Sequence, residues 1–224
     1  LIFAEKMVQL GARTTIPTTI NAISVDREHW QHSGLASDFG KRASRLADAY
    51  VTMGVKPTFT CAPYLLSDKP QFGEKIGWSE SNAVIFANTV LGAQTQKHPD
   101  YLDLFIAMTG RAPAVGVYST AGRQASLRIA VQIPKNWSSD DDSLWPLIGW
   151  LAGKFAPDAI PLITGLESTN PSIDDLKGLC AAFGTTSGAP MLHIAGQTPE
   201  ASEQTSQELP EKQIQLDDLR EAWF

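Results

Sequence analysis

The feature that most constrains the fold of this 224-residue chain is a repeated change between helical and strand-like patterns. Four stretches with apolar residues at helical spacing each end on a glycine, at Gly11, Gly54, Gly92 and Gly110. Glycine is typical of helix ends because it adopts the left-handed backbone conformation there without steric penalty. Short β-prone runs lie between these helices. The alternation predicts an α/β protein with a mostly parallel sheet.

Two parts of the chain depart from this alternation. Residues 114–134 read as a β-hairpin that turns at Ala121 and Gly122, whereas residues 159–196 have the strand, helix, strand order of a βαβ unit. After residue 200 the composition becomes polar and rich in Gln, Glu and Ser, which favours a surface linker. We therefore expect an α/β body over residues 1–200, and a linker with the start of a following helix over residues 201–224.

Charge and composition exclude several classes of partner. The formal net charge is -6 and no dense run of Lys or Arg occurs, which argues against nucleic acid and against an anionic membrane surface. No apolar run has the length of a membrane span. We expect a cytoplasmic protein that acts on a small soluble molecule. The chain begins without Met and stops within a helical pattern, so we expect it to be an interior part of a larger chain.

The two cysteines have different surroundings in the sequence. Cys180 lies in a helical pattern in which the apolar positions on its face are Leu176, Leu179 and Phe183. This spacing predicts a core residue.

Cys61 follows the β-prone run TFT and precedes Pro63, so its sulfur lies where a strand ends. In open α/β sheets, ligands bind at the carboxyl ends of the strands. The residues alone leave two interpretations open, a small buried side chain at a strand end or a functional thiol. One thiol cannot hold a metal without partners from elsewhere, and the four histidines give no local sign of a base for a nucleophile.

Several long motifs, in order along the chain, resemble one family. They are IPTTINAISVD, MGVKPTFTCAPYL, FGEKIGWSESNAVIFANTVLGAQTQ, HPDYLDLFIAMTGRAP and DDLKGLCAAFGTTSGAPMLHIAGQTPEA. Together they look like the large-subunit portion of aconitase X, a branch of the aconitase superfamily. The resemblance implies an aconitase-like layered α/β domain and an iron–sulfur cluster of unspecified type.

The resemblance also implies a hydro-lyase that dehydrates a small hydroxy acid. The block KHPDYLDLFIAMTGRAP is more similar to the type that converts cis-3-hydroxy-L-proline to a pyrroline carboxylate. Two alternatives stay open, namely dehydration of mevalonate 5-phosphate and a non-catalytic, cluster-free binding or scaffold protein. The small swivelling domain or subunit that would bring the catalytic base is absent from this sequence, so the catalytic residues are unknown and the chain alone is expected to be inactive.

Site residues follow from the motifs that match. The resemblance implies that Cys61 binds the metal cluster, and that a small-molecule carboxylate substrate is bound by residues of SESN and of two Thr-rich turns. The candidates for substrate binding are Thr18, Thr19, Asn21, Glu80, Ser81, Asn82 and Ser187. The alternative for all of them is a purely structural role, in which they cap helices and turns.

Four further positions carry expectations. Asn88 is a poor helix former in the middle of FANTVLG, where a polar contact and a solvated face are both open. His193 alternates with apolar neighbours and is expected in the core. Lys75 and Gln94 stand where the family commonly has His and Arg. Because glutamine offers only neutral hydrogen bonds, these departures bear on substrate identity and would permit the non-catalytic alternative.

Overall fold

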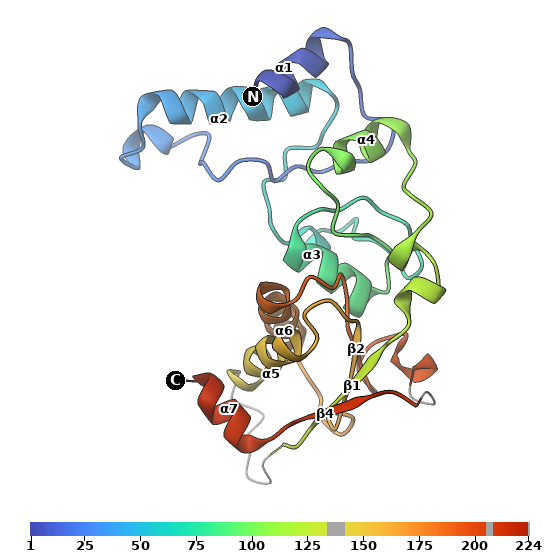
Figure 1. The fold of residues 1–224 in the computed structure, drawn as a ribbon. Helices are drawn as coiled ribbons and strands as arrows, with labels where there is room; N and C mark the ends of the chain where they lie inside the picture. Colours follow the sequence, from blue (N-terminus) through green and yellow to red (C-terminus); the bar gives the residue numbers. More distant parts are fainter. Residues whose placement is uncertain (134–141, 205–207, 224) are drawn as a thin grey trace. The chain divides into compact units, whose positions relative to one another are not determined.

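The computed structural model describes residues 1–133, 142–204 and 208–223 (Figure 1). The chain divides into two compact units. Unit 1 comprises Leu1–Leu66 with His98–Ala112, and unit 2 comprises Ser67–Lys97 with Pro113–Phe224. Among the described residues, no helix is both long and apolar enough to cross a membrane.

Unit 1 is built from three helices around a small apolar core. They are α1 (Ile2–Gln9), α2 (Ser37–Thr52) and α4 (Leu102–Thr109), joined by segments with the 3-10 turns η1 (Trp30–His32) and η2 (Pro63–Leu65). Ala12, Met53 and Leu104 form the buried centre, against which Phe3, Met7, Val8, Tyr50 and Met108 pack. Gly11, Gly54 and Gly110 have positive φ after these helices, as their placement in the sequence predicted.

In unit 1, an isolated β-bridge replaces the strands that the sequence predicted before and at Cys61. A single parallel bridge joins Thr19 to Lys56, and neither segment is an assigned strand. Pro17 and Pro57 each lack the backbone N–H group that a longer ladder would need. The expectation of full strands here was therefore wrong, although the two segments do run parallel.

Unit 2 contains the sheet, which has the order β3-β2-β1-β4. The strands are β1 (Leu127–Val131), β2 (Pro161–Thr164), β3 (His193–Ile194) and β4 (Glu211–Ile214), and every pairing is parallel. The helices are α3 (Ser81–Phe86), α5 (Leu144–Phe155), α6 (Ile173–Thr186) and α7 (Leu216–Trp223). This confirms the predicted α/β class with a parallel sheet and the βαβ unit.

Helices α5 and α6 pack against each other on one side of the sheet (Figure 1). Their backbones approach closely at Gly149, where an added Cβ atom would lie 2.2 Å from the carbonyl oxygen of Leu179. A larger residue would push the helices apart. The side chains that fill the space between the helices and the sheet are apolar and fully buried, among them Trp145, Ile148, Phe183, Ile129 and Ile163.

The predicted β-hairpin over residues 114–134 was wrong where the structure describes it. Two 3-10 turns, η4 (Gly116–Tyr118) and η5 (Ala121–Arg123), replace its first strand and turn. Both edges of β1 are occupied by parallel partners, β2 and β4, which leaves no edge for an antiparallel neighbour. The two turns stack closely, since a Cβ atom on Gly122 would lie 2.0 Å from Gly116 O. Residue 134 lies outside the described residues.

The stretch after residue 200 has more regular secondary structure than the linker that the sequence predicted. It contains the 3-10 turn η6 (Ala201–Glu203), strand β4 and helix α7. Strand β4 forms the edge of the sheet and leaves Glu211, Lys212 and Gln213 exposed. An edge strand of this kind has the polar composition of a linker, which explains the difference from the sequence-based expectation.

Candidate functional site

An open cavity of about 610 Å³ lies in unit 1 beside Cys61. It is lined by residues 21–26, Phe59 and Cys61. Two of the predicted site residues, Asn21 and Cys61, therefore share one cavity, although 40 positions separate them in the sequence. Of the two interpretations left open for Cys61, a buried side chain at a strand end is not observed, because the residue is exposed and lines a cavity.

The parallel bridge explains why these two residues meet. Thr19 pairs with Lys56, and the N–H group of Phe59 donates to the carbonyl oxygen of Ile20 at 2.8 Å. Because the two segments run in the same direction, Asn21 and Cys61 both follow the paired part and leave it at the same end. The site thus lies at the carboxyl end of a parallel pair, as in larger α/β sheets.

The backbone turns sharply between the bridge and Cys61. Phe59 has φ of +46°, a conformation that non-glycine residues rarely adopt. Such a residue costs about 1–3 kcal/mol and is concentrated at functional sites. The turn leaves Cys61 as an exposed, reduced thiol.

Cys180 is the opposite case. It lies on the buried face of α6 with Leu176, Leu179 and Phe183, and is 1% exposed. Burial raises the pKa of its thiol well above the ordinary range, so it stays protonated and unreactive. The prediction of a core cysteine is confirmed.

Among the described residues that line the cavity, Asp26 carries the only charged side chain. Its Oδ1 accepts from the N–H groups of Glu28 at 2.9 Å and His29 at 3.1 Å, and its Oδ2 lies 3.1 Å from His29 Nδ1. These backbone hydrogen bonds lower the pKa of Asp26, which is therefore ionised at neutral pH. The nearby Arg27 lies over the Phe59 ring and pairs with Asp48, so its charge is already matched.

The described residues can supply one ligand to a metal cluster. Among them, no three His, Cys, Asp or Glu side chains gather closely enough to hold a metal ion. Protein iron–sulfur clusters are held mainly by several Cys thiolates. Cys61, exposed at an open cavity, fits one such ligand position, and the other ligands would have to come from outside the described part of the chain.

The SESN block, Ser79 to Asn82, lies in unit 2, where Glu80 is the residue before α3. Glu80 and Ser81 are exposed and Asn82 is half-buried. The helix start has no side-chain capping hydrogen bond, and the Oγ atom of Ser79 is buried without a hydrogen-bond partner among the described residues. The simple capping alternative is therefore not observed at Ser79 or Glu80. Whether this block serves the same site as Cys61 stays a prediction.

The other predicted binding residues make local contacts. Thr18 Oγ1 donates to Ile16 O at 2.9 Å, and Thr19 forms the bridge described above. Ser187 is buried, and its hydroxyl donates to Ala156 O at 2.7 Å and accepts from Ala189 N–H at 3.1 Å. These contacts give the Ser187 hydroxyl a structural role in unit 2, and its part in substrate binding stays a prediction.

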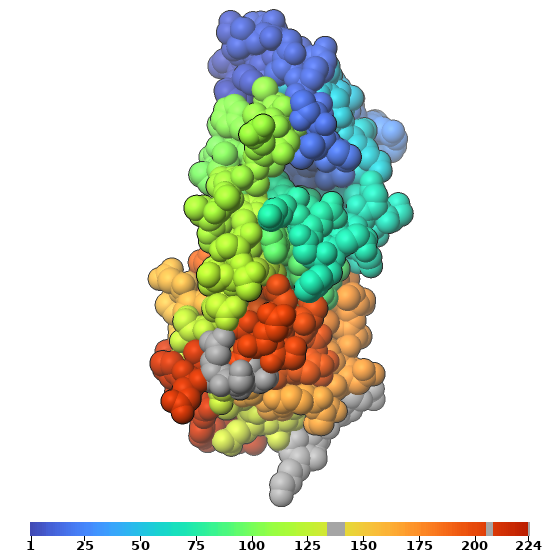
Figure 2. Space-filling model, turned by 90° about the vertical axis from the view of Figure 1, so that its right-hand side faces the viewer, coloured from blue at the N-terminus to red at the C-terminus, as the bar shows by residue number. Residues whose placement is uncertain are grey.

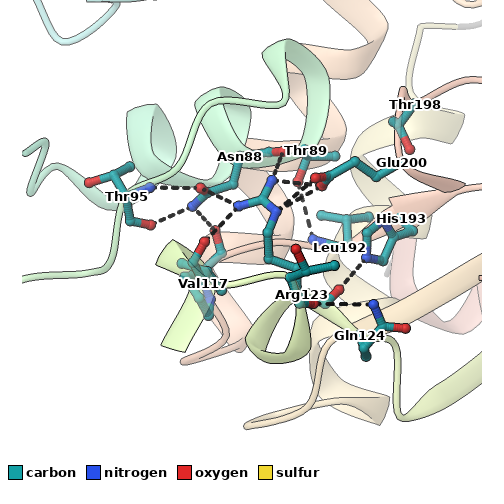
Figure 3. A network of polar contacts seen from close by, with 12 residues as sticks. Asn88, Thr89, Thr95, Val117, Arg123, Gln124, Leu192, His193, Thr198 and Glu200 are labelled. Atoms are coloured by element: carbon teal, nitrogen blue, oxygen red, sulfur yellow. Dashed lines mark hydrogen bonds and ion pairs between the residues drawn. The ribbon is translucent and has the colours of Figure 1, made fainter. Parts of the chain in front are cut away.

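A buried polar network in unit 2 contains residues that the sequence did not reveal (Figure 3). Arg123, with a side chain 3% exposed, pairs with Glu200 at 2.7 Å and donates to Asn88. Arg123 lies in a polar stretch with no pattern that indicates burial. The sequence signal that did point here was Asn88, whose predicted polar contact is confirmed and which is fully buried.

His193 belongs to the same network. It is 1% exposed, as predicted for a core histidine, and its Nε2 lies 2.7 Å from Arg123 O. Burial lowers its pKa. The neutral ring donates to that carbonyl and ties β3 to η5.

The two departures from the family pattern are neighbours in unit 2. Lys75 and Gln94 form a parallel bridge, in which Gln94 N–H donates to Glu74 O at 2.8 Å and Ile76 N–H donates to Gln94 O at 3.0 Å. The side-chain Oε1 of Gln94 is buried and has no partner among the described residues. The backbone pairing at this position does not depend on the side chain.

Comparisons with known proteins agree over the whole chain. The family model described as the aconitase X first domain matches residues 1–121, and that of the aconitase X second domain matches residues 125–224. A solved structure, aconitase X of Thermococcus kodakaraensis in its holo-form, superimposes with a TM-score of 0.85 at 28% identity, covering 98% of this chain and 53% of that one.

Curated relatives are named as dehydratases. A cis-3-hydroxy-L-proline dehydratase of Hypocrea jecorina is 49% identical over 90% of this chain, and one of Pseudomonas aeruginosa is 46% identical over 100%. A phosphomevalonate dehydratase large subunit of Methanothermobacter thermautotrophicus is 34% identical over 93%. The chain spans 34%, 39% and 50% of the lengths of these three relatives.

Proposed function

Because this chain belongs to the aconitase X family, we propose that it is part of an iron–sulfur hydro-lyase that dehydrates cis-3-hydroxy-L-proline to a pyrroline carboxylate. The observation that carries the proposal is the higher identity to relatives named for that substrate, 49% and 46%, than to the relative named for phosphomevalonate, 34%. A cytoplasmic location goes with the proposal, since both cysteines are reduced thiols.

The charge of the cavity supports the same choice of substrate. Cis-3-hydroxy-L-proline carries a secondary ammonium group and one carboxylate. Asp26 is ionised and the lining residues include no Lys or Arg, so the cavity attracts a cationic amine and repels a phosphate group. Mevalonate 5-phosphate has no cationic group to pair with Asp26.

The dehydration needs several functional groups, of which this chain supplies some and the rest of the enzyme supplies others. Dehydration removes the proton from C2 and hydroxide from C3, and the resulting enamine rearranges to the cyclic imine. We assign Cys61 as one thiolate ligand of the cluster. When bound, an iron–sulfur cluster supplies a Lewis-acidic iron for the departing hydroxyl group.

The remaining roles are proposed residue by residue. In unit 1, Asp26 pairs with the ammonium group, while the amide of Asn21 and the hydroxyls of Thr18 and Thr19 bind substrate oxygens. The segment Ser79 to Asn82 at the start of α3, called the turn below, is assigned within unit 2 to the binding of a carboxylate, and the match of its SESN motif to the family supports this role. The base that removes the C2 proton is expected from a small swivelling domain or subunit.

The test is a substrate comparison with the complete enzyme. The full-length polypeptide that contains this chain, with its small domain or subunit, is prepared anaerobically and given cis-3-hydroxy-L-proline or mevalonate 5-phosphate. We expect formation of pyrroline carboxylate from the first and no reaction with the second. Turnover of the phosphorylated substrate alone would favour the phosphomevalonate alternative, and inactivity toward both would favour the non-catalytic one.

A further inference from the structure

We propose that Thr95 is a positioning residue, which transmits the rigidity of the buried Arg123–Glu200 ion pair to the Ser79 to Asn82 turn. The proposal rests on the proposed function, in which that turn binds the substrate carboxylate.

The first link is the contact between Thr95 and the residue that leads into the turn. The Thr95 hydroxyl accepts the N–H group of Trp78 at 3.1 Å and donates to Trp78 O at 3.1 Å. One side chain therefore fixes both polar backbone groups of Trp78, directly before Ser79. No side-chain hydrogen bond caps the helix that follows, so the Thr95 hydroxyl holds the backbone at the entry to the turn.

The second link ties Thr95 to Asn88. Thr95 N–H donates to Asn88 Oδ1 at 3.0 Å, and Asn88 Nδ2 donates to Thr95 O at 2.7 Å. Asn88 lies in the π-helical turn η3 (Ala87–Leu91), which continues α3. Single π-helical turns within α-helices are frequent at functional sites. The turn and the far end of its own helix are thus joined through one buried pair of side chains.

The third link anchors Asn88 to a fixed charge. Arg123 Nη1 donates to Asn88 Oδ1 at 3.2 Å, and Arg123 Nη2 donates to Asn88 O at 3.0 Å. The remaining side of the guanidinium group faces Glu200, with Nε 2.9 Å from both carboxylate oxygens (Figure 3). A planar guanidinium group held on several sides has little freedom to move.

The ion pair also joins two surface segments of unit 2. Arg123 is the last residue of η5 in the yellow-green stretch that also contains η4, and Glu200 directly precedes the orange-red turn η6. The two stretches lie side by side in Figure 2. The side chain of Glu200 is 15% exposed and that of Arg123 3%. The ion pair is therefore almost completely shielded from water. Hydrogen bonds to charged groups are stronger in such a low-dielectric interior than in water.

Comparison of Thr89 with Thr95 distinguishes a positioning role from a general contribution to stability. Thr89 is buried like Thr95, and its hydroxyl accepts one backbone N–H group, that of Leu192 at 3.1 Å, without contacting Trp78. Thr89→Val and Thr95→Val each remove a buried hydroxyl at almost constant volume. Both should lower the thermal midpoint by similar amounts, whereas only Thr95→Val should loosen the turn.

Hydrogen exchange measured by mass spectrometry on the full-length protein gives a readout that needs no turnover. Peptides that cover residues 77–83 should exchange about three- to tenfold faster in Thr95→Val than in wild type, because both hydrogen bonds between the Thr95 hydroxyl and the Trp78 backbone are lost. Thr89→Val should leave them unchanged, and Thr95→Ser, which retains the hydroxyl, should restore slow exchange. Equal exchange of these peptides in the two valine variants would overturn the proposal.

Kinetics then tests the functional half. Thr95→Val should raise KM for cis-3-hydroxy-L-proline about three- to tenfold, with Thr89→Val close to wild type. An unchanged KM in Thr95→Val, despite faster exchange, would overturn the role of the turn in binding. If the wild-type enzyme does not use cis-3-hydroxy-L-proline, the proposed function fails, and the exchange experiment still decides whether Thr95 holds the turn.

Discussion

The cavity of unit 1 and the polar network of unit 2 use polar side chains in opposite ways. Around the cavity, the segments are irregular, one parallel bridge pairs them, and Asn21, Asp26 and Cys61 are exposed. In the network, Asn88, Thr95 and Arg123 are at most 2% exposed and are joined by hydrogen bonds on several sides. The polar side chains of the first region are exposed at a cavity, whereas those of the second are buried and bond to one another.

This difference indicates which residues can be substituted without a loss of stability. A buried network is costly to break, because the groups left behind are unpaired in a low-dielectric interior. An exposed cavity residue has little influence on stability, so its effect should fall on chemistry. The predictions below test this division, from the largest expected effect to the smallest.

The two cysteines give the sharpest contrast. Cys61→Ser should lower turnover by the full-length enzyme more than about 100-fold, because a hydroxyl is a poor ligand for iron compared with a thiolate, and should leave the stability of the cluster-free protein unchanged. Cys180→Ser should retain turnover and lower the free energy of unfolding by about 1–3 kcal/mol through a buried hydroxyl. Turnover assays and urea unfolding measure both. Full activity of Cys61→Ser would break the comparison.

The buried ion pair should dominate stability in unit 2. Arg123→Met leaves Glu200 without its ion-pair partner and removes two hydrogen bonds to Asn88, so it should lower the free energy of unfolding by about 3–5 kcal/mol. Arg27→Met removes the half-exposed pair with Asp48 and is the control, with an expected loss of about 0–1 kcal/mol. Equal losses in urea unfolding would mean that the network is not the rigid region.

Asp26 should set substrate affinity by its charge. Asp26→Asn keeps the Oδ1 acceptor for the backbone N–H groups of Glu28 and His29 but removes the negative charge, so KM for cis-3-hydroxy-L-proline should rise about three- to tenfold. Asp38→Asn removes an exposed carboxylate of α2 outside the cavity and should leave KM unchanged. If Asp26→Asn had the same KM as wild type, the charge of Asp26 would not bind the substrate ammonium group.

The pH dependence of stability should show the smallest effect. Burial lowers the pKa of His193 in the folded chain below its ordinary value of about 6.5. Between the two values only the unfolded chain binds the proton, so this contribution is complete above pH about 6.5 and is lost as the pH falls through the folded pKa. His193→Gln should flatten the decline of unfolding free energy between pH 6.5 and 5, by less than about 1.4 kcal/mol per pH unit. An unchanged slope would place the titration elsewhere.

The sequence predicted helices better than strands, for a physical reason. The helices are specified locally by apolar spacing and terminal glycines, and α1, α2 and α4 end close to the expected glycines, Gly11, Gly54 and Gly110. Strand β4 and the turns η4 and η5 depend on which edges of β1 are occupied, and this is decided by residues far apart in the chain. Local patterns do not contain that information.

The same limit applies to the site. Cys61 and Asn21 were predicted from motifs, and their meeting in one cavity depends on a bridge that no local pattern indicates. Arg123 and Glu200 were missed because charged residues are usually exposed, and only their pairing permits burial. Asn88 was found because a poor helix former in a helix interior needs a compensating contact.

The most direct test of the central claim is the iron bound per polypeptide, measured together with visible absorption, in anaerobically prepared full-length wild type, Cys61→Ser and Cys180→Ser. The account predicts iron and cluster absorption in wild type and in Cys180→Ser, and the loss of both in Cys61→Ser. Equal iron content and absorption in Cys61→Ser and wild type would contradict it.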